Sequence, residues 1–563
     1  MRHLLRPLLG PAPLIPSALL LLLAGCPGPQ MRDTDDDSDS GPPPTTNPTT
    51  DSPTSGFDLL CMPGTARCSD DVTVELCKNT GLSYEKIPCT GYQACVDGEC
   101  IGPCEKVAVD APSSEGCEFY AIRMRSFNEL PEDRDALIVG NTNGSLTANV
   151  QLYLAPNNSH NDEPVGDPVA LAPGESHIFE LSSDLLQGYS TVRIGGVFRV
   201  ESDLPIAAYL HSSLENKASN DSSLLLPVHA LRQEYVVPSY PGFADSKNPD
   251  ATNGRPSYFN VIALEDNTTI SWTPRFDTAG DGIAVQPRLA GETGQITLSR
   301  FDVLQIGSTS KTNTEYFTHD VSGTLVSADR KVALLGATNC AFVPFTSGFC
   351  NHLQEQAFPL DYWGKVYVGA HSPVRNSEKH YWRIYAGEAG VTVTTDPPQA
   401  GTPFTLFERG AFKDLEVPNG VSFVFQATGP ILPVQFLAGN SAAGGIGDPA
   451  MYQMVPVEQW LKRYVFVTGI NYGLNYAQVI RRFEGADVTI NGQVVGGYYL
   501  INTVSGGKYE VADVLLPGGD MAQSYVAESD DDFNVVVIGY TNNTSLSAYA
   551  YPGGMAVKRI YDP

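Results

Sequence analysis

Cysteine offers more chemistry than any other residue type in this chain, because its thiol can form a disulfide, bind zinc or carry a lipid. The chain has 11 cysteines among 563 residues. Cys340 and Cys350 stand apart from the others, with His352 close behind them. The trio is compatible with a metal site or with a disulfide that closes a short loop. We predict the disulfide, because an exported pair at this spacing usually closes a loop.

Eight further cysteines crowd into one stretch of the chain. This stretch lacks the two C-x-x-C pairs of a zinc knuckle and contains no histidine, so we predict disulfides and no metal. The sequence leaves their connectivity open. The eight residues are Cys61, Cys68, Cys77, Cys89, Cys95, Cys100, Cys104 and Cys117.

The remaining cysteine, Cys26, ends a hydrophobic run that reads LLLLLAGC and follows a basic N-terminus. This pattern resembles the lipobox of bacterial lipoproteins. The resemblance implies that residues 1–25 are a signal peptide and that Cys26 is lipidated. The lipid would then anchor the protein to its membrane partner. An ordinary secretory signal is the alternative. Pro27 in place of Asp favours the outer membrane or cell surface, although inner against outer membrane stays open.

Charge and composition narrow the partners further. The chain has 35 basic and 63 acidic residues, a net charge of −28. Phosphate binding needs clustered Lys and Arg, so nucleic acid is excluded as a partner. Residues 26–56 are rich in Pro, Thr, Ser and Asp, and we expect a disordered tether behind the lipid.

The rest of the sequence consists of short runs in which apolar and polar residues alternate, bounded by Gly, Pro, Asn and Asp. This pattern is typical of β-strands. We expect an all-β protein with a small disulfide-rich module at 57–117 and a repeat domain at 118–563. Four repeats emerge. One of the recurring segments runs from a proline to an aromatic strand at a fixed spacing: Pro227 to Tyr235, Pro359 to Tyr367 and Pro456 to Tyr464.

The two ends of the repeat array differ. The last apolar strand, near residue 537, has no aromatic strand after it, whereas residues 118–124 form an aromatic strand with no apolar strand before it. We therefore prefer a propeller-like ring of four β-units that the first strand closes. Four tandem β-sandwiches, each beginning with its aromatic strand, are the alternative.

Two segments carry a resemblance to a known family. One runs from Cys340 through C350-N-H-L-Q-E-Q to Trp363-Gly364, and the other from Gly447-Asp448-Pro449 to Phe466. They resemble the IgGFc-binding protein N-terminal domain family over roughly 118–563, with Asn351 where the family often has Asp. The resemblance implies a β-rich, secreted recognition module without a cofactor, and names no ligand.

Candidate catalytic residues are few. The histidines His229, His319, His352, His371 and His380 are scattered, with no H-E-x-x-H or G-x-S-x-G motif. Glu355-Gln356 and Glu458-Gln459 recur near the Pro-to-aromatic turns, where we expect them to bond turn backbone. We predict no catalytic residue, no cofactor and a non-enzymatic surface adhesion or recognition protein whose ligand is an extracellular protein or glycan. The alternatives are a structural envelope or matrix component, and a polysaccharide hydrolase or lyase.

Cys26→Ala should abolish lipid labelling and release the protein from membranes, because the lipid on this thiol is the expected hydrophobic anchor. Labelling with a radioactive fatty acid, followed by cell fractionation, checks this. Unchanged labelling and unchanged fractionation would contradict the assignment.

Overall fold

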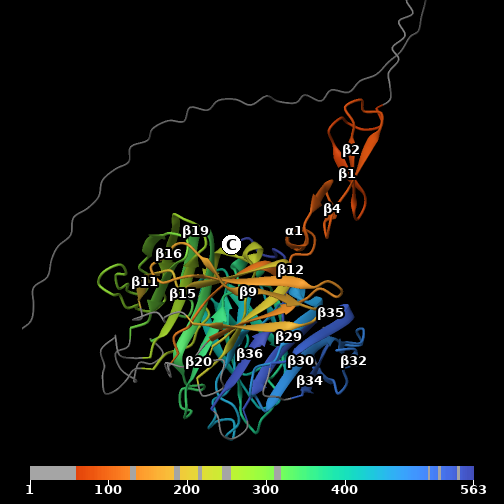
Figure 1. Ribbon diagram of the computed structural model, residues 1–563. Helices are drawn as coiled ribbons and strands as arrows, with labels where there is room; N and C mark the ends of the chain where they lie inside the picture. Colours follow the sequence, from red (N-terminus) through yellow and green to blue (C-terminus); the bar gives the residue numbers. More distant parts are fainter. Residues whose placement is uncertain are drawn as a thin grey trace, which may run out of the picture. The chain divides into compact units, whose positions relative to one another are not determined.

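The computed structural model describes residues 59–126, 135–182, 190–212, 219–243, 255–309, 319–501, 503–504, 508–517, 522–541 and 546–563. The expected signal peptide, residues 1–25, and the whole of the expected tether, residues 26–56 with Cys26, lie outside this part of the chain. The described residues belong to one compact unit, Leu59–Pro563. No helix among them is long and apolar enough to cross a membrane. Strands dominate the regular structure (Figure 1), which confirms the all-β prediction.

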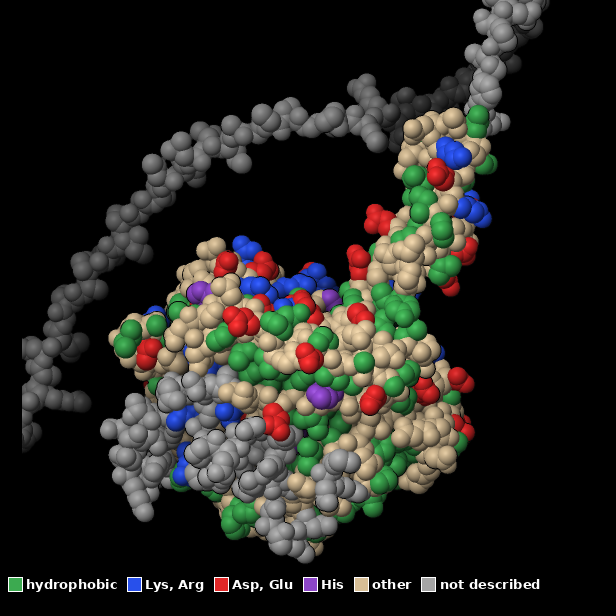
Figure 2. Space-filling model, in the orientation of Figure 1, with side chains coloured by type: hydrophobic (Ala, Val, Ile, Leu, Met, Phe, Trp, Pro, Cys, Tyr) green, Lys and Arg blue, Asp and Glu red, His purple; other side chains and the backbone are tan. Residues whose placement is uncertain are grey.

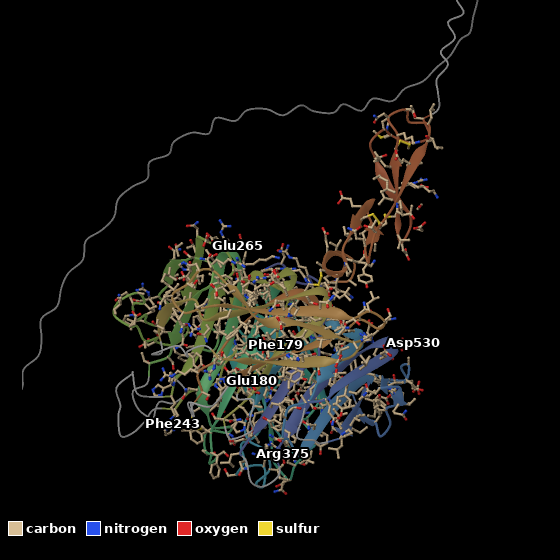
Figure 3. The ribbon with its side chains drawn as sticks, in the orientation of Figure 1. Phe179, Glu180, Phe243, Glu265, Arg375 and Asp530 are labelled. Atoms are coloured by element: carbon tan, nitrogen blue, oxygen red, sulfur yellow. A yellow bond between two sulfur atoms is a disulfide. The ribbon has the colours of Figure 1, made fainter. Side chains whose placement is uncertain are left out.

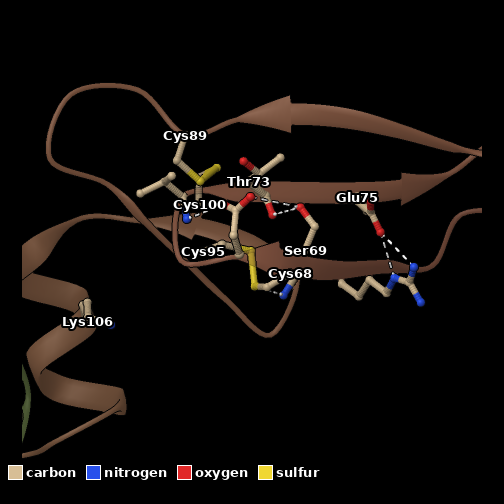
Figure 4. Close-up of a disulfide and its surroundings, with 12 residues drawn as sticks. Cys68, Ser69, Thr73, Glu75, Cys89, Cys95, Cys100 and Lys106 are labelled. Atoms are coloured by element: carbon tan, nitrogen blue, oxygen red, sulfur yellow. Dashed lines mark hydrogen bonds and ion pairs between the residues drawn. A yellow bond between two sulfur atoms is a disulfide. The ribbon is translucent and has the colours of Figure 1, made fainter.

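The first described segment is held together by disulfides more than by a core. Few of its side chains are buried, among them Val74, Cys77 and Cys95, so the covalent bonds supply stability that a small module cannot gain from burial. The disulfides join Cys61 to Cys77, Cys68 to Cys95, Cys89 to Cys100 and Cys104 to Cys117, and Figure 4 shows the Cys68–Cys95 bond. The disulfide-rich character predicted for this region is confirmed. Its elements are β1 (Ala66–Asp70), β2 (Thr73–Cys77), β3 (Tyr84–Pro88), β4 (Ala94–Val96), β5 (Glu99–Ile101) and α1 (Pro103–Val109).

The repeat region consists of four units built on one plan. A long strand passes through two sheets of its unit, except in the third unit, where it is divided into two strands. Its first half pairs with the unit's aromatic first strand, and its second half pairs with a short exit strand. The two sheets pack face to face, so apolar side chains that alternate along the strands meet in a shared core.

The first and second units each carry a continuous long strand. In the first unit the first, long and exit strands are β6, β12 and β13, and in the second they are β14, β19 and β20. The strands of the first unit are β6 (Gly116–Ile122), β7 (Asp135–Asn141), β8 (Ala148–Ala155), β9 (Glu163–Leu171), β10 (Ser176–Leu181), β11 (Thr191–Ile194), β12 (Val197–His211) and β13 (Ser222–Leu224). Those of the second are β14 (Arg232–Val236), β15 (Ser257–Ala263), β16 (Thr268–Thr273), β17 (Gly294–Leu298), β18 (Asp302–Gly307), β19 (Leu325–Ala341) and β20 (Asn351–Gln356).

The third unit has two separate four-stranded sheets, ordered β21-β26-β23-β24 and β25-β22-β27-β28. The fourth restores a continuous long strand, β35, between first strand β29 and exit strand β36. The third unit contains β21 (Val366–Gly369), β22 (His380–Ala386), β23 (Val391–Asp396), β24 (Phe404–Leu406), β25 (Phe412–Val417), β26 (Phe423–Ala427), β27 (Ile431–Phe436) and β28 (Met451–Gln453). The fourth contains β29 (Leu461–Val467), β30 (Leu474–Arg482), β31 (Thr489–Ile490), β32 (Gln493–Val494), β33 (Tyr499–Ile501), β34 (Tyr509–Leu516), β35 (Ser524–Tyr540) and β36 (Ala548–Pro552).

The Pro-to-aromatic segments join one unit to the next. Each contains a short 3-10 turn, η1 (Val228–Ala230), η3 (Leu360–Tyr362) or η4 (Val457–Gln459). The tyrosine that follows each turn is buried, and its hydroxyl accepts a hydrogen bond from the N–H three residues before it. The same hydroxyl donates to a carbonyl of its unit's long strand: Tyr235 to Val332, Tyr367 to Ile431 and Tyr464 to Phe533. The spacing found in the sequence therefore places one buried tyrosine at the same point of three units.

The first strand does not close a ring in the way the sequence led us to expect. We predicted that residues 118–124 would complete the last unit, but β6 pairs with β12 of its own unit, Phe119 lying opposite Val200. That part of the ring prediction is wrong. The reason is local: the long strand β12 is close in the chain and offers β6 a matching edge, as each long strand does for its own first strand. The strand pairing is that of the sandwich alternative.

The units are nevertheless not independent domains. The exit strands contact one another in a cycle, β13 with β20, β20 with β28, β28 with β36, and β36 with β13. The fourth unit also reaches the first at another point, where the N–H of Ser114 donates to the carbonyl of Met555 at 2.7 Å. In addition β11, from the first unit, pairs with β18 of the second. The four sandwiches are thus joined side to side, and the last contacts the first.

Asp221 lies where the four exit strands meet. Its carboxyl group is fully buried and accepts backbone N–H groups from every unit: Ser222 at 2.9 Å, Gln354 at 3.2 Å, Met451 at 3.0 Å and Ala550 at 3.5 Å. Burial raises the pKa of Asp221 well above its ordinary value, against the opposing effect of these four donors. One side chain therefore joins all four units through their backbones.

Asp221→Ala should destabilise the whole repeat region by more than about 3 kcal/mol, because it leaves several buried N–H groups without an acceptor. Urea unfolding followed by tryptophan fluorescence measures the change, and we expect one cooperative transition that moves as a unit. Asp530→Asn, at an exposed carboxylate of the fourth unit (Figure 3), is the matched control and should shift stability by less than about 0.5 kcal/mol. Loss of only the first unit would argue against a joined assembly.

Candidate functional site: a disulfide-closed aromatic loop

The connections from the long strands to the exit strands come together beside the exit-strand cycle. Neighbouring connections are hydrogen-bonded to one another across unit boundaries. The N–H of Gly439, in the third unit, donates to the carbonyl of Val343 in the second at 2.6 Å, and the N–H of Gly447 donates to the carbonyl of Thr541 in the fourth at 3.2 Å. Loops on a rigid sheet scaffold are the usual place for binding residues, so this group of connections is the first place to look for a site.

The connection of the second unit is closed by a disulfide. Cys340 and Cys350 are bonded, with their Cα atoms 5.2 Å apart. Cys340, Ala341 and Val343 are fully buried and anchor the start of the loop. Its far side is fixed to the third unit, because the Gly348 N–H donates to the Ser441 hydroxyl at 2.6 Å and the Ser347 and Ser441 hydroxyls lie 2.8 Å apart. The loop is therefore held at both ends and at its tip.

Phe349 is the most unusual residue of this loop. Its side chain is 52% exposed, and its backbone adopts φ +65°, in the left-handed region. A bulky residue rarely occupies that region, because Cβ crowds the carbonyl oxygen. An exposed apolar ring in a strained backbone conformation is more often kept for function than for stability.

Two other phenylalanines belong to the same loop, and a third lies against one of them. Phe342 and Phe345 of the same loop have ring centroids 6.2 Å apart, and the Phe342 ring lies 5.3 Å from that of Phe243, which Figure 3 labels at the lower left of the view. All three are partly exposed. We name Phe243, Phe342, Phe345 and Phe349 the aromatic loop cluster. Our reading of the sequence missed it, although three phenylalanines between two cysteines were a visible signal.

The residues that follow the loop, Asn351 and His352, are polar and buried. The Asn351 amide donates to the carbonyls of Asn220 at 2.8 Å and Pro449 at 2.6 Å, and its oxygen accepts the Asn220 N–H at 3.0 Å. An aspartate at 351 could not make the two donations, which gives the departure from the family pattern a structural role. The neighbouring His352 is fully buried, and burial lowers its pKa to about 4. It is neutral near pH 7 and packs beneath the loop.

The alternative reading of Cys340, Cys350 and His352 as metal ligands finds no geometric support. Both cysteine sulfurs are bonded to each other, and His352 faces Gln354, with Nε2 3.3 Å from Oε1. Across the described ranges, no group of three or more His, Cys, Asp and Glu side chains is placed to hold a metal ion.

Glu355 and Gln356 lie buried in the centre, and only Gln356 bonds backbone next to a linker turn, as expected from the sequence. Glu355 accepts from the Ser223 hydroxyl and the Gln453 amide, both at 3.2 Å, while Gln356 accepts the Leu226 N–H. Burial, with Asp221 nearby, raises the pKa of Glu355 well above its ordinary value. The expected match to Glu458-Gln459 is wrong, because these residues lie in the turn η4. The equivalent of Gln356 is Gln453, which accepts the Phe358 N–H at 2.8 Å, since both glutamines stand three residues before a linker proline.

Two of the other histidines contact a serine hydroxyl. His211 Nδ1 lies against the Ser222 hydroxyl, His380 Nδ1 lies 3.3 Å from that of Ser372, and all four side chains are buried. His229 Nε2 lies 3.1 Å from the Ser113 carbonyl, and burial lowers its pKa to about 4. His371 and His380 lie near each other, with ring centroids 5.2 Å apart, and Tyr499 stacks on His371. Burial, reinforced by His371, lowers the pKa of His380 to about 3. His319 is also buried, in the second unit. These histidine side chains therefore pack inside the fold.

Charged side chains do not gather in a single funnel on the face that Figure 2 shows. Acidic and basic groups are scattered there among apolar and polar ones. One buried ion pair joins two units: Arg383 of the third unit pairs with Asp320 of the second at 2.6 Å, and it also pairs with Asp414 of its own unit at 2.7 Å. The aromatic loop cluster is therefore the surface feature with the clearest character of a binding site.

Fold and loop together define a disulfide-bonded, all-β assembly with an aromatic surface loop, a class suited to extracellular recognition. A model of the family described as IgGFc binding protein matches residues 221–539, which is more than half of the 563 residues. The chain belongs to this family. The match begins at Asp221 and leaves out most of the first unit. That unit is the divergent copy, with Phe119 at the position of the buried tyrosines in the other three.

The human IgGFc-binding protein is 26% identical to this chain over 372 residues. The aligned part is 66% of this chain and 6% of the human protein. The chain therefore spans only a small fraction of its human relative, and the activity in that protein's name is a property of the human protein.

Phe349→Gly should stabilise the protein by about 1 kcal/mol, because glycine occupies the left-handed region without the steric cost that phenylalanine bears there. Thermal unfolding by circular dichroism measures the gain. Phe345→Gly is the control: Phe345 is not among the residues with positive φ, so glycine there should lower stability. Equal effects of the two substitutions would remove the argument for strain at Phe349.

Asp448 gives the stability of this region a pH dependence. Its side chain is 1% exposed, Oδ1 accepts the Asn440 N–H at 3.2 Å, and Oδ2 has no hydrogen-bond partner among the described residues. Burial raises its pKa from 3.8 to about 7. A raised pKa means that folding favours the protonated form, so this stabilisation is complete below about pH 4 and disappears as pH rises through 7.

Asp448→Asn should therefore remove about 2 to 3 kcal/mol of pH-dependent stability between pH 5 and pH 8. Wild type should lose stability over this range relative to the variant, and the variant should be the more stable at pH 8. Urea unfolding at both pH values measures the difference. Parallel profiles for the two proteins would show that Asp448 is ionised throughout.

Proposed function

We propose that this chain is a lipid-anchored, non-enzymatic recognition protein of the bacterial outer membrane or cell surface, and that it binds an extracellular protein through the aromatic loop cluster. The observation that carries the proposal is the loop 340–350: it is closed by a disulfide, tied to the next unit and presents exposed phenylalanine. Rigid aromatic side chains supply binding energy at a low entropic cost, which is why they are enriched in recognition surfaces.

Family membership supports a protein as ligand. The human relative is named for binding the Fc part of IgG, and the family match includes the whole of loop 340–350. The aromatic loop cluster is apolar and fixed, as a protein-binding surface should be. A glycan is the second class of ligand to test, since aromatic rings also stack on sugars.

The lipid anchor is supported by the sequence L-A-G-C at Cys26 and by the Pro- and Asp-rich segment after it. The non-enzymatic part of the proposal is supported by the histidines, because burial lowers the pKa values of four of them (His211, His229, His352 and His380). The scattered acidic groups of Figure 2 favour recognition over the hydrolase or lyase alternative.

The test uses the secreted Cys26→Ala protein, which keeps every residue after the lipid site. It is applied to a serum-protein array that includes IgG and its Fc fragment, and in parallel to a glycan array. We expect a protein ligand. Phe349→Ala should weaken its binding by about 2 kcal/mol, roughly 30-fold, if this ring is a hot spot.

Phe407→Ala is the matched control, because the Phe407 ring is 77% exposed in a different loop. Its affinity should equal that of the parent. Binding that survives Phe349→Ala would place the site elsewhere, and binding only to glycans would replace the protein ligand. Self-association of the secreted protein without any array binding would favour the structural envelope or matrix component.

A further inference from the structure

The third unit has an unpaired sheet edge at a position that is filled elsewhere in the molecule. The sheet that contains the exit strand has a corresponding strand in each unit: β10 in the first, β18 in the second, β25 in the third and β34 in the fourth. Among the described residues, β10 carries no strand on its outer side. In the second unit β11 pairs with the outer side of β18, and in the fourth β33 pairs with the outer side of β34. Within the gap-free range 319–501 and the other described ranges, β25 carries no strand there. The fold itself shows that this edge position accepts an added strand.

The backbone groups that an added strand would use can be assigned from the pairing of β25 with β22. The N–H of Ala386 donates to the carbonyl of Ala411 at 2.9 Å, and antiparallel pairs alternate from there. The N–H and C=O groups of Phe412, Asp414 and Glu416 therefore point away from β22. The side chains of Asp414 and Glu416 pair with Arg383 and Lys379, so their charge would not repel a strand placed beside them.

A groove of about 460 Å³ lies where β25 begins. Phe276, Arg275 and Pro274 of the second unit line one side, and Glu408 and Arg409 of the third line the other. The Phe276 ring centroid is 6.3 Å from that of Phe412, the first residue of β25. The groove and the open edge are thus neighbours.

The unit boundary at this groove is closely packed. A Cβ placed on Gly323, which has φ +77°, would lie 2.2 Å from the carbonyl oxygen of Gly410, so the two backbones touch. The groove is therefore a fixed feature of the boundary between two joined units.

Two arginines line the groove, and each lies close to a glutamate. Arg275 Nη1 lies 3.4 Å from Glu408, whose side chain is 74% exposed. Arg409 lies 3.5 Å from Glu234 and donates to the Gly387 carbonyl at 3.0 Å. An exposed ion pair is worth little, so a carboxylate of a ligand can replace Glu408 at Arg275 and gain from Arg409 as well.

We propose that β25 and this groove form a docking site for an extended peptide segment. The segment adds to the sheet as a further strand, pairs with the outward backbone groups of Phe412, Asp414 and Glu416, and places a carboxylate at its end in the groove beside Arg275 and Arg409. Main-chain pairing supplies affinity and the carboxylate supplies direction, as in other recognition by strand addition. The site is separate from the aromatic loop cluster and goes beyond the function proposed above.

Panning a random peptide library on the secreted Cys26→Ala protein tests the proposal. We expect enrichment of peptides that alternate apolar residues and carry an acidic residue or a free C-terminal carboxylate at one end. Amidated and Asp-to-Asn versions of an enriched peptide separate these two sources of the carboxylate. Failure to enrich such peptides would overturn the proposal.

Glu416→Pro removes an outward N–H without touching the bonds to β22, and Glu416→Ala is its control. Peptide binding should fall at least tenfold with proline and stay near the parent value with alanine. Arg275→Ala should weaken binding of the carboxylate-ended peptide but not of its neutral version. Equal binding by the proline and alanine variants would refute strand addition.

Hydrogen exchange measured by mass spectrometry gives a readout without a substitution in the strand. Bound peptide should slow exchange in residues 412–417 and leave loop 340–350 unchanged. Protection confined to the loop would assign the peptides to the aromatic loop cluster and overturn this proposal. Because Phe349→Ala should leave binding of these peptides intact, failure here and failure of the proposed function are distinguishable.

Discussion

The buried carboxyl group of Asp221 is the interaction on which the rest of the assembly depends. It accepts backbone N–H groups from four strands that belong to four different units. A buried carboxyl group needs hydrogen-bond partners to offset desolvation, and here the partners come from the exit strands of every unit. The cost of burying Asp221 is offset only when all four units are in place, which links their stabilities.

Several other polar side chains are buried around Asp221, where the four exit strands meet. Asn351, Glu355, Gln356 and Gln453 are fully buried and bond across unit boundaries. Apolar packing between units would hold them at similar distances but would not specify one rotation of each unit against the next. Directional hydrogen bonds do so, although Glu355 Oε1 and Gln356 Nε2 have no hydrogen-bond partner among the described residues. The loops above the centre inherit this fixed geometry, and so does the aromatic loop cluster.

Much of the fold was accessible from the sequence because strand periodicity and turn residues are local signals. Strand-rich composition, the four repeats and the spacing from Pro227, Pro359 and Pro456 to the buried tyrosines were visible in the chain. Closure was not. The phase of the repeat made residues 118–124 look like a missing last strand, yet β6 pairs with β12, because pairing partners are chosen by three-dimensional proximity that a linear pattern does not contain. The mismatch of Glu458-Gln459 has the same origin, since two similar dipeptides occupied different elements.

By itself the sequence determined the strand content, the repeat, the excess of acidic charge and the clustering of cysteines, because each of these depends on residue type and spacing along the chain. Only the tertiary structure decided how the eight clustered cysteines pair, that Asp221 accepts hydrogen bonds from four units, that Phe349 is exposed in a left-handed backbone, and that the edge of β25 is open. These features depend on contacts between residues far apart in the chain. Such contacts form only when the units meet, and no local pattern of residues encodes them.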